Sequence, residues 1–260
     1  MSRRPAVDAL RRVVRSARAF ASTPGALPGF LIIGAQRCGT TSLHSYLSAH
    51  PAVRAASGKE LQYFSLHYGR GERWYRGHFP PDALSFEASP LYLFHPDAPA
   101  RVAATLPAGR FIALLRDPVE RAWSHYLHTR SYGQEPLDFA AALEAEESRL
   151  STPDGWRRYS YAARGRYAEQ LERWYAHIPR ERLHAIRSED FYADPAAVYA
   201  EVLAFLGLEP FTPPEFAVHT RRVDRSGPPP EVVSRLRGEF APHNDRLADL
   251  LGWKAPWPSG

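Results

Sequence analysis

The chain has 260 residues, of which 44% are hydrophobic, 12% aromatic and 23% charged. These proportions are typical of a globular protein with a sizeable core, and they exclude a chain that is disordered throughout. The formal net charge is +5, and the first 23 residues hold six arginines against one aspartate, so the rest of the chain is neutral overall. The charge therefore gives no indication of a nucleic-acid partner for the body of the protein.

Cysteine and lysine are both scarce. The single cysteine, Cys38, excludes an internal disulfide and a cysteine-based zinc site, and it favours a reducing, cytoplasmic location. Lys59 and Lys254 are the only lysines, a bias toward arginine that is typical of a GC-rich genome, and we expect a bacterial source. No stretch approaches the roughly 20 apolar residues of a membrane span.

We divide the chain into a basic leader over residues 1–29 and one folded domain over residues 30–260. A proline- and glycine-rich stretch over residues 24–29 separates the two. The leader has no apolar run after its arginines, so we expect no signal peptide. Residues 3–20 can form a basic amphipathic helix with a weak affinity for a membrane surface, but we favour a flexible or loosely docked segment.

The hydrophobic pattern predicts strands that alternate with helices. We expect strands over residues 30–33, 53–56, 85–88, 110–116 and 183–187. We expect helices over residues 41–50, 117–129, 167–177, 195–206 and 231–250, with a mixture of helix and loop over 131–160. This alternation predicts an α/β fold in which helices flank a parallel sheet in a single domain.

The helix after the fourth strand has a clear start. Asp117 can cap it, Pro118 suits its first position, and Glu120 stands where a capping box places an acidic residue. The strand before it is apolar almost throughout, as the central strands of parallel sheets are.

The segment 34–42, GAQRCGTTS, lies between the first strand and the first helix. Backbone N–H groups and the positive end of a helix can hold a phosphate or sulfate at such a place. The spacing resembles the GxxxxGK[ST] loop of nucleotide triphosphatases, but Thr40 occupies the lysine position. Arg37 puts a cation inside the loop instead. The segment therefore predicts an anion-binding loop.

A second motif begins at Arg116, at the end of the fourth strand, and includes Ser124 on the helix that follows. Ligands of open parallel sheets bind beyond the carboxyl ends of the strands. A guanidinium at this position can hold a phosphate through two hydrogen bonds, although it can equally pair with a neighbouring acid.

Together, segments 30–42 and 115–126 resemble the 5′- and 3′-phosphosulfate-binding segments of the sulfotransferases that use 3′-phosphoadenosine 5′-phosphosulfate (PAPS). The chain is most similar to the heparan sulfate N- and 3-O-sulfotransferases and their bacterial relatives. The likeness extends through residues 59–64 (KELQYF), 87–92 (EASPLY) and 167–170 (YAEQ). It implies a P-loop-like parallel α/β fold and sulfuryl transfer from PAPS to a carbohydrate or similar acceptor, with adenosine 3′,5′-bisphosphate (PAP) as the product.

The same resemblance implies the donor site. Arg37 matches the family's loop lysine, which neutralises charge on the leaving phosphate oxygen, and the scheme needs no metal. The implied donor-binding residues are Arg37, Cys38, Gly39, Thr40, Thr41 and Ser42 in the loop, Arg116 and Ser124 at the 3′-phosphate, and Arg221 and Arg222, with Arg225 in reserve, in a basic loop over the phosphates.

The resemblance also implies the catalytic residues. Glu60 matches the family's general base, a carboxylate that takes the proton of the acceptor hydroxyl or amine as the new S–O or S–N bond forms. Where the heparan sulfate enzymes have a lysine this chain has Ala88, so an identical acceptor is not implied. The candidate acceptor-binding residues are Lys59, Tyr63, Glu87 and Ser89.

Alternatives remain open from the sequence alone. An ATP-dependent kinase or triphosphatase would need a loop lysine and an acidic residue that binds Mg²⁺. A non-enzymatic protein would act through its basic leader. The aromatic residues within 63–79 fit an acceptor cleft and a core equally well, and we expect His125 and His128 to be structural. The sequence predicts neither the acceptor nor the oligomeric state.

Overall fold

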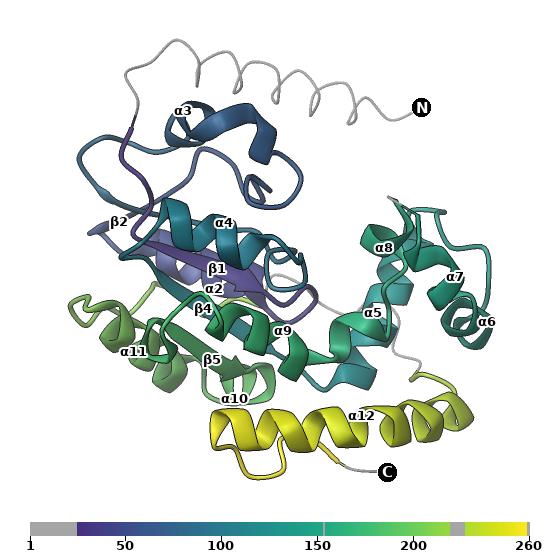
Figure 1. The fold of residues 1–260 in the computed structure, drawn as a ribbon. Coiled ribbons are helices and arrows are strands. Elements are labelled where there is room, and N and C mark those ends of the chain that lie inside the picture. The colour runs from purple at the N-terminus through teal and green to yellow at the C-terminus, as the bar shows by residue number, and fades with distance from the viewer. Residues whose placement is uncertain (1–24, 153, 219–226, 259–260) are drawn as a thin grey trace, which may run out of the picture.

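A five-stranded parallel sheet forms the centre of the molecule (Figure 1). The computed structural model describes residues 25–152, 154–218 and 227–258. The strands are β1 (Phe30–Gly34), β2 (Val53–Ala55), β3 (Leu84–Ala88), β4 (Arg110–Leu115) and β5 (Leu183–Arg187). Their spatial order is β2-β3-β1-β4-β5, and every pairing is parallel. The predicted α/β fold is confirmed.

Eleven helices are described around the sheet in these parts of the chain. The five predicted helices are confirmed within a few residues: α2 (Thr40–Ala49), α5 (Pro118–Ser131), α9 (Tyr167–Tyr175), α11 (Pro195–Leu206) and α12 (Pro230–Leu251). The predicted mixture over 131–160 contains α6 (Phe139–Glu144), α7 (Glu146–Leu150) and α8 (Gly155–Arg158). The sequence did not predict α3 (Gly71–Arg76), α4 (Ala98–Thr105) and α10 (Ser188–Ala193), which are too short for a clear periodic pattern.

The order of the strands creates a crevice beside β1. The chain runs from β1 through α2 to the far side of β3, whereas α4 returns it to β4 on the other side of β1. Because crossovers in parallel sheets are right-handed, α2 covers one face and α4 and α9 cover the other (Figure 1). The segments after β1 and β4 therefore leave neighbouring strand ends in opposite directions, where open α/β sheets bind ligands.

The start of α5 confirms one predicted cap and corrects another. The Asp117 carboxylate accepts hydrogen bonds from the backbone N–H groups of Val119 at 2.8 Å and Glu120 at 3.1 Å. The capping box does not form, because the Asp117 N–H donates to the carboxylate of Glu189 at 2.9 Å. Glu120 pairs with Arg116 at 3.1 Å instead. Glu189 of α10 therefore accepts the hydrogen bond from the Asp117 N–H that the spacing predicted for Glu120.

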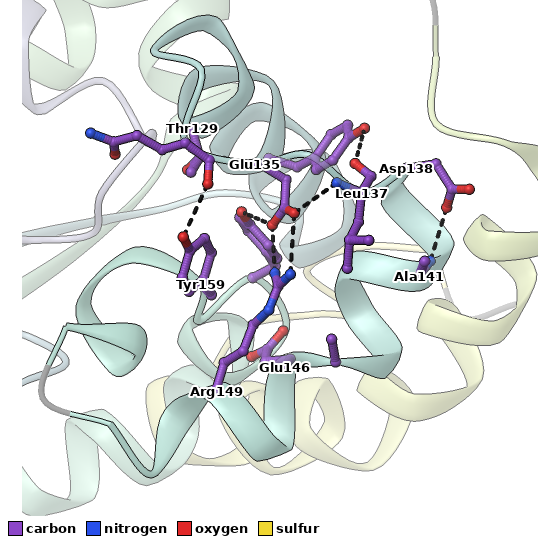
Figure 2. A network of polar contacts seen from close by, with 12 residues as sticks. Thr129, Glu135, Leu137, Asp138, Ala141, Glu146, Arg149 and Tyr159 are labelled. Carbon is purple, nitrogen blue, oxygen red and sulfur yellow. Dashed lines mark hydrogen bonds and ion pairs between the residues drawn. The ribbon is translucent and has the colours of Figure 1, made fainter.

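A second, smaller apolar core lies beyond α5, where α6, α7 and α8 group to one side of the sheet (Figure 1). A buried ion pair holds this region together: Arg149 Nη1 lies 2.6 Å from the fully buried Glu135 carboxylate (Figure 2). Tyr161 donates to the same carboxylate at 2.8 Å, and the Leu137 N–H does so at 3.1 Å. We call residues 134–164 the insert.

The described part of the predicted leader belongs to the folded domain. Leu27 packs against the main core, and the Gly29 N–H donates to the Ser85 carbonyl at 2.9 Å, so ordered packing begins before residue 30. The rest of the leader, residues 1–24, lies outside the described residues. Among the helices of the described ranges, none combines the length and the apolar character that crossing a membrane requires.

Candidate active site

The predicted anion-binding loop turns sharply between β1 and α2. Gly39 caps α2 with a φ of 99°, and a Cβ at this position would lie 2.9 Å from the hydroxyl of Tyr192. Arg37 also has a positive φ, 73°. Glycine adopts this conformation readily, whereas an arginine there costs about 1–2 kcal/mol. The first backbone N–H groups of α2 point out of the helix end, which is the arrangement that holds anions.

A cavity of about 960 Å³, which we call the loop cavity, opens over this segment. Of the residues that the structure describes, three arginines line it: Arg37 from the loop, Arg116 from the end of β4 and Arg187 from the end of β5. Its other lining residues include Gly39, Thr40, Thr41, Glu60, Ser124, Tyr192 and Trp257. The cavity therefore combines a helix N-terminus with cations from three neighbouring strand ends.

The two sequence motifs meet across this cavity. The Arg37 Nε donates to the Ser124 Oγ at 3.1 Å, over a separation of 87 residues. Burial lowers the pKa of Arg37, and the nearby Arg116 guanidinium lowers it further. Two like charges held close together are relieved by an anion between them. The arrangement is therefore suited to a ligand that carries phosphate or sulfate groups.

A second cavity, of about 720 Å³, adjoins the first and we call it the adjoining cavity. Residues from the segment after β2 form one wall, and residues from the insert and α5 form the other. The two cavities share five lining residues: Gln36, Glu60, Pro90, His128 and Tyr132. The adjoining cavity is also lined by Lys59, Gln62, Arg70, Trp74, His125, Arg157, Arg158 and Arg164.

Glu60 stands at the junction of the two cavities. Its carboxylate lies 3.9 Å from Lys59 Nζ, and Gln62 Nε2 donates to it at 3.5 Å. The side chain is 48% exposed, so it is accessible from the space around it. The backbone is held in place by the Glu60 N–H, which donates to the Ala88 carbonyl at 3.0 Å. A half-exposed carboxylate between two cavities is suited to take a proton from a molecule in one as it reacts with a molecule in the other.

Lys59, a predicted acceptor-binding residue, contacts the anion-binding loop as well. Its Nζ donates to Thr41 Oγ1 at 2.5 Å, and its side chain lines the adjoining cavity. Burial lowers the pKa of Lys59, an effect that the neighbouring Glu60 opposes. The lysine therefore connects the first turn of α2 with the carboxylate at the junction.

The structure does not place Tyr63, Glu87 and Ser89 where the predicted acceptor contacts need them. All three side chains are buried, at 3%, 0% and 0% exposure, and none lines either cavity. The Glu87 carboxylate accepts hydrogen bonds from Tyr75 at 3.0 Å, Tyr92 at 2.6 Å and Ser89 at 2.7 Å. Their polar groups are thus satisfied inside the protein, and these residues form the support behind the cavity wall.

Two predicted donor-binding residues face inward too. Cys38 and Ser42 are fully buried and line neither cavity, so only their backbone can face the loop cavity. Burial raises the pKa of the Cys38 thiol to about 11. Predicted residues Arg221, Arg222 and Arg225 lie outside the described residues.

Several lining residues were missed by the sequence analysis. Arg187 ends β5, so the rule that ligands bind at strand ends could have found it. No sequence pattern indicated Tyr192, because the helix that carries it, α10, was not predicted. None indicated Trp257 either, since residues 256–258 reach the cavity only through tertiary packing. Trp257 packs against Tyr167, with ring centroids 5.8 Å apart.

Some of the histidines and aromatic residues line a cavity, and others lie in the core. His125 and His128 line the adjoining cavity, and burial lowers the pKa of both. Of the aromatic residues in 63–79, Phe64, Trp74, Tyr75 and Phe79 belong to the core, and Trp74 also borders the adjoining cavity. Within the described ranges, no group of three His, Cys, Asp or Glu side chains could hold a metal ion.

The comparison with known proteins agrees with this geometry. Residues 27–220 match the sulfotransferase domain family. The chain belongs to that family. A crystal structure of a sulfotransferase from Alicyclobacillus acidocaldarius is 30% identical, with a TM-score of 0.74, and the match covers 88% of this chain and 97% of that one.

Two similar relatives modify heparan sulfate according to their names. The chain is 34% identical over 198 residues to the human bifunctional heparan sulfate N-deacetylase/N-sulfotransferase 2, which covers 71% of this chain and 22% of that protein. It is 30% identical over 257 residues to the mouse heparan sulfate glucosamine 3-O-sulfotransferase 3B1, which covers 89% of this chain and 65% of that protein. The chain thus spans about a fifth of the first relative's length and somewhat under two thirds of the second's.

Proposed function

We propose that this sulfotransferase domain transfers a sulfuryl group from PAPS to a hydroxyl or amine of a carbohydrate acceptor. The observation that carries the proposal is the convergence of Arg37, Arg116 and Ser124 over a helix N-terminus, next to a second cavity with Glu60 at the junction. Family membership supports the reaction class.

The loop cavity would hold the donor. Its volume of about 960 Å³ is that of a site for a nucleotide-sized ligand. Arg37 and the first N–H groups of α2 would hold the 5′-phosphosulfate end, and Arg116 with Ser124 would hold the 3′-phosphate. The Arg116 guanidinium already pairs with Glu120 at 3.1 Å, which keeps it extended along the first turn of α5.

The reaction would run in line across the junction. The acceptor oxygen or nitrogen attacks sulfur, the bond between sulfur and the bridging phosphate oxygen breaks, and PAP leaves with the electron pair of that bond. Glu60 accepts the acceptor proton. Arg37 stabilises the negative charge that develops on the leaving oxygen, a role that a preorganised cation fills at low energetic cost.

The adjoining cavity supports a carbohydrate acceptor that carries negative charge. Arg70, Arg157 and Arg158 line it, and among the described residues that line it Glu60 is the one acidic residue. Carboxylate or sulfate groups on a sugar would pair with these arginines. The cytoplasmic location and the weak membrane contact of the leader stay predictions.

A transfer assay with ³⁵S-labelled PAPS tests the proposal. De-N-acetylated heparosan offers free amines, hydroxyls and glucuronate carboxylates, and chitosan oligosaccharides offer amines and hydroxyls without carboxylates. We expect label in the heparosan product, little in the chitosan product and none with the Glu60→Gln variant. Equal labelling of both sugars would contradict the anionic acceptor, and labelling by Glu60→Gln at the wild-type rate would contradict the role of Glu60.

A further inference from the structure

The segment that carries Glu60 is held in an unusual backbone conformation. Glu60 and Gln62 have φ angles of 58° and 56°, in the left-handed region that non-glycine residues rarely adopt. Such a conformation persists only where the surrounding structure imposes it. The contacts that impose it here must therefore come from outside the segment.

Two backbone N–H groups of this segment bond to the end of β3 and to the residue that follows it. The Glu60 N–H donates to the Ala88 carbonyl at 3.0 Å. The Gln62 N–H donates to the Ser89 Oγ at 3.1 Å. One of these two acceptors is a side-chain oxygen, so the side chain of Ser89 helps to fix the path of the segment.

Glu87 is the centre of that support. Its carboxylate is fully buried and accepts hydrogen bonds from three hydroxyl groups, those of Tyr75, Ser89 and Tyr92. Burial raises the pKa of Glu87, and the three hydroxyl groups oppose that shift. We call Glu87, Tyr75, Ser89 and Tyr92 the Glu87 cluster.

We propose that Glu87 and Ser89 are positioning residues that aim the Glu60 carboxylate at the junction of the two cavities. The inference rests on the proposed function, because Glu60 must be the base for its aim to matter. Ser89 links the two parts directly, since its Oγ donates to Glu87 Oε2 at 2.7 Å and accepts from Gln62. Misplacing a reacting group by about 1 Å can cost about 100-fold in rate.

The cluster offers a matched pair of variants. Ser89→Ala and Tyr75→Phe each remove one hydroxyl hydrogen bond from the same carboxylate. Only Ser89→Ala also removes the acceptor of the Gln62 N–H. Structural damage to the cluster would affect both variants, whereas a positioning role predicts a catalytic effect of Ser89→Ala alone. Glu87→Gln, which keeps the size of the side chain, is the third variant.

The first measurement is steady-state transfer from PAPS to de-N-acetylated heparosan. We expect Ser89→Ala and Glu87→Gln to lower kcat by about 10- to 100-fold with unchanged acceptor KM and PAP affinity, and Tyr75→Phe to keep the wild-type kcat. Equal kcat values for Ser89→Ala and wild type, or equal losses in Ser89→Ala and Tyr75→Phe, would overturn the proposal.

The second measurement is hydrogen exchange of the full chain, which needs no acceptor. We expect Ser89→Ala, but not Tyr75→Phe, to speed exchange of the amides at residues 60–62 and to leave β1 and β4 protected. Unchanged exchange at 60–62 would overturn the proposal even if the sugar is no substrate. Failure of the wild-type protein to bind PAP would contradict the proposed function instead, and the two failures are therefore distinguishable.

Discussion

The two cavities differ in how the chain builds them. The loop cavity takes Arg37, Arg116 and Arg187 from the carboxyl ends of three neighbouring parallel strands. The adjoining cavity takes its walls from the irregular segment after β2 and from the insert, which packs with α5 and α12 in the smaller apolar core. A site at strand ends inherits its geometry from the sheet. The other site depends on side-chain contacts such as those of Glu135 (Figure 2) and those of Glu87.

Replacement of Glu60, the base that we propose at the junction, is expected to have the largest effect. We expect Glu60→Gln to lower turnover by about 10²- to 10⁴-fold, because the amide cannot accept the acceptor proton. PAP affinity should stay unchanged, as measured by calorimetry. Glu72→Gln, an exposed glutamate of α3 that lines neither cavity, is the control and should keep full activity. Wild-type turnover in Glu60→Gln would show that another group takes the proton.

Breaking the buried ion pair of the insert should destabilise the wall of the adjoining cavity and leave the sheet that carries the loop cavity intact. We expect Arg149→Met to cost about 3 kcal/mol in the free energy of unfolding of the insert, because the Glu135 carboxylate loses its cation while buried. Urea unfolding monitored by hydrogen exchange should show the insert opening before the sheet. Arg157→Ala removes the exposed partner of Asp154 and should change stability by less than about 0.5 kcal/mol. Equal stability of Arg149→Met and wild type would contradict the account.

Removal of one strand-end cation weakens donor binding by a smaller amount. We expect Arg116→Ala to lower PAP affinity by about 10- to 100-fold, which corresponds to the loss of charge-assisted hydrogen bonds of about 1.5–3 kcal/mol. Isothermal titration of the folded variant measures this. Arg235→Ala, on the exposed side of α12, serves as the control for the change in net charge. Unchanged affinity in Arg116→Ala would place the 3′-phosphate elsewhere.

A titration on α2 should give the smallest effect. Burial, together with the nearby Lys59, lowers the pKa of His44 from 6.5 to about 4. Because the folded state favours the neutral imidazole, this contribution to stability is complete above about pH 6.5 and is lost as the pH falls toward 4. The urea midpoint of His44→Gln should therefore fall less between pH 7 and pH 5 than that of the wild type. Identical pH dependence in the two proteins would contradict this assignment.

The sequence predicts the motifs of the loop cavity because each motif is a short, contiguous segment with a recognisable local pattern. The strand, the glycine turn and the helix start over 30–49 are contiguous, and Arg116 and Ser124 follow a strand that is recognisable by its apolar run. The alternation of strands and helices also predicts the sheet. The hydrogen bond from Arg37 to Ser124 joins the two motifs. It depends on tertiary packing, and the packing that it needs is the pairing of β1 with β4.

The adjoining cavity could not be predicted in the same way. Glu87 lies in β3 and Ser89 directly follows the strand, with Ala88 between them. This spacing does not predict that the oxygen atoms of both side chains are buried. The wall from Arg157, Arg158 and Arg164 depends on how the insert packs on α5, which no local pattern encodes. Contacts between distant segments therefore set the shape of the adjoining cavity.

We propose that the loop cavity is a donor site that recognises a 3′-phosphate. The most direct test is calorimetric titration of the wild-type chain with PAP, with ADP and AMP as comparators in the presence and absence of Mg²⁺. The account predicts that PAP binds without Mg²⁺ and at least tenfold more tightly than ADP or AMP, since these lack the 3′-phosphate that Arg116 and Ser124 would hold. Equal binding of ADP and PAP, or binding of ADP that requires Mg²⁺, would contradict it and favour an ATP-dependent enzyme.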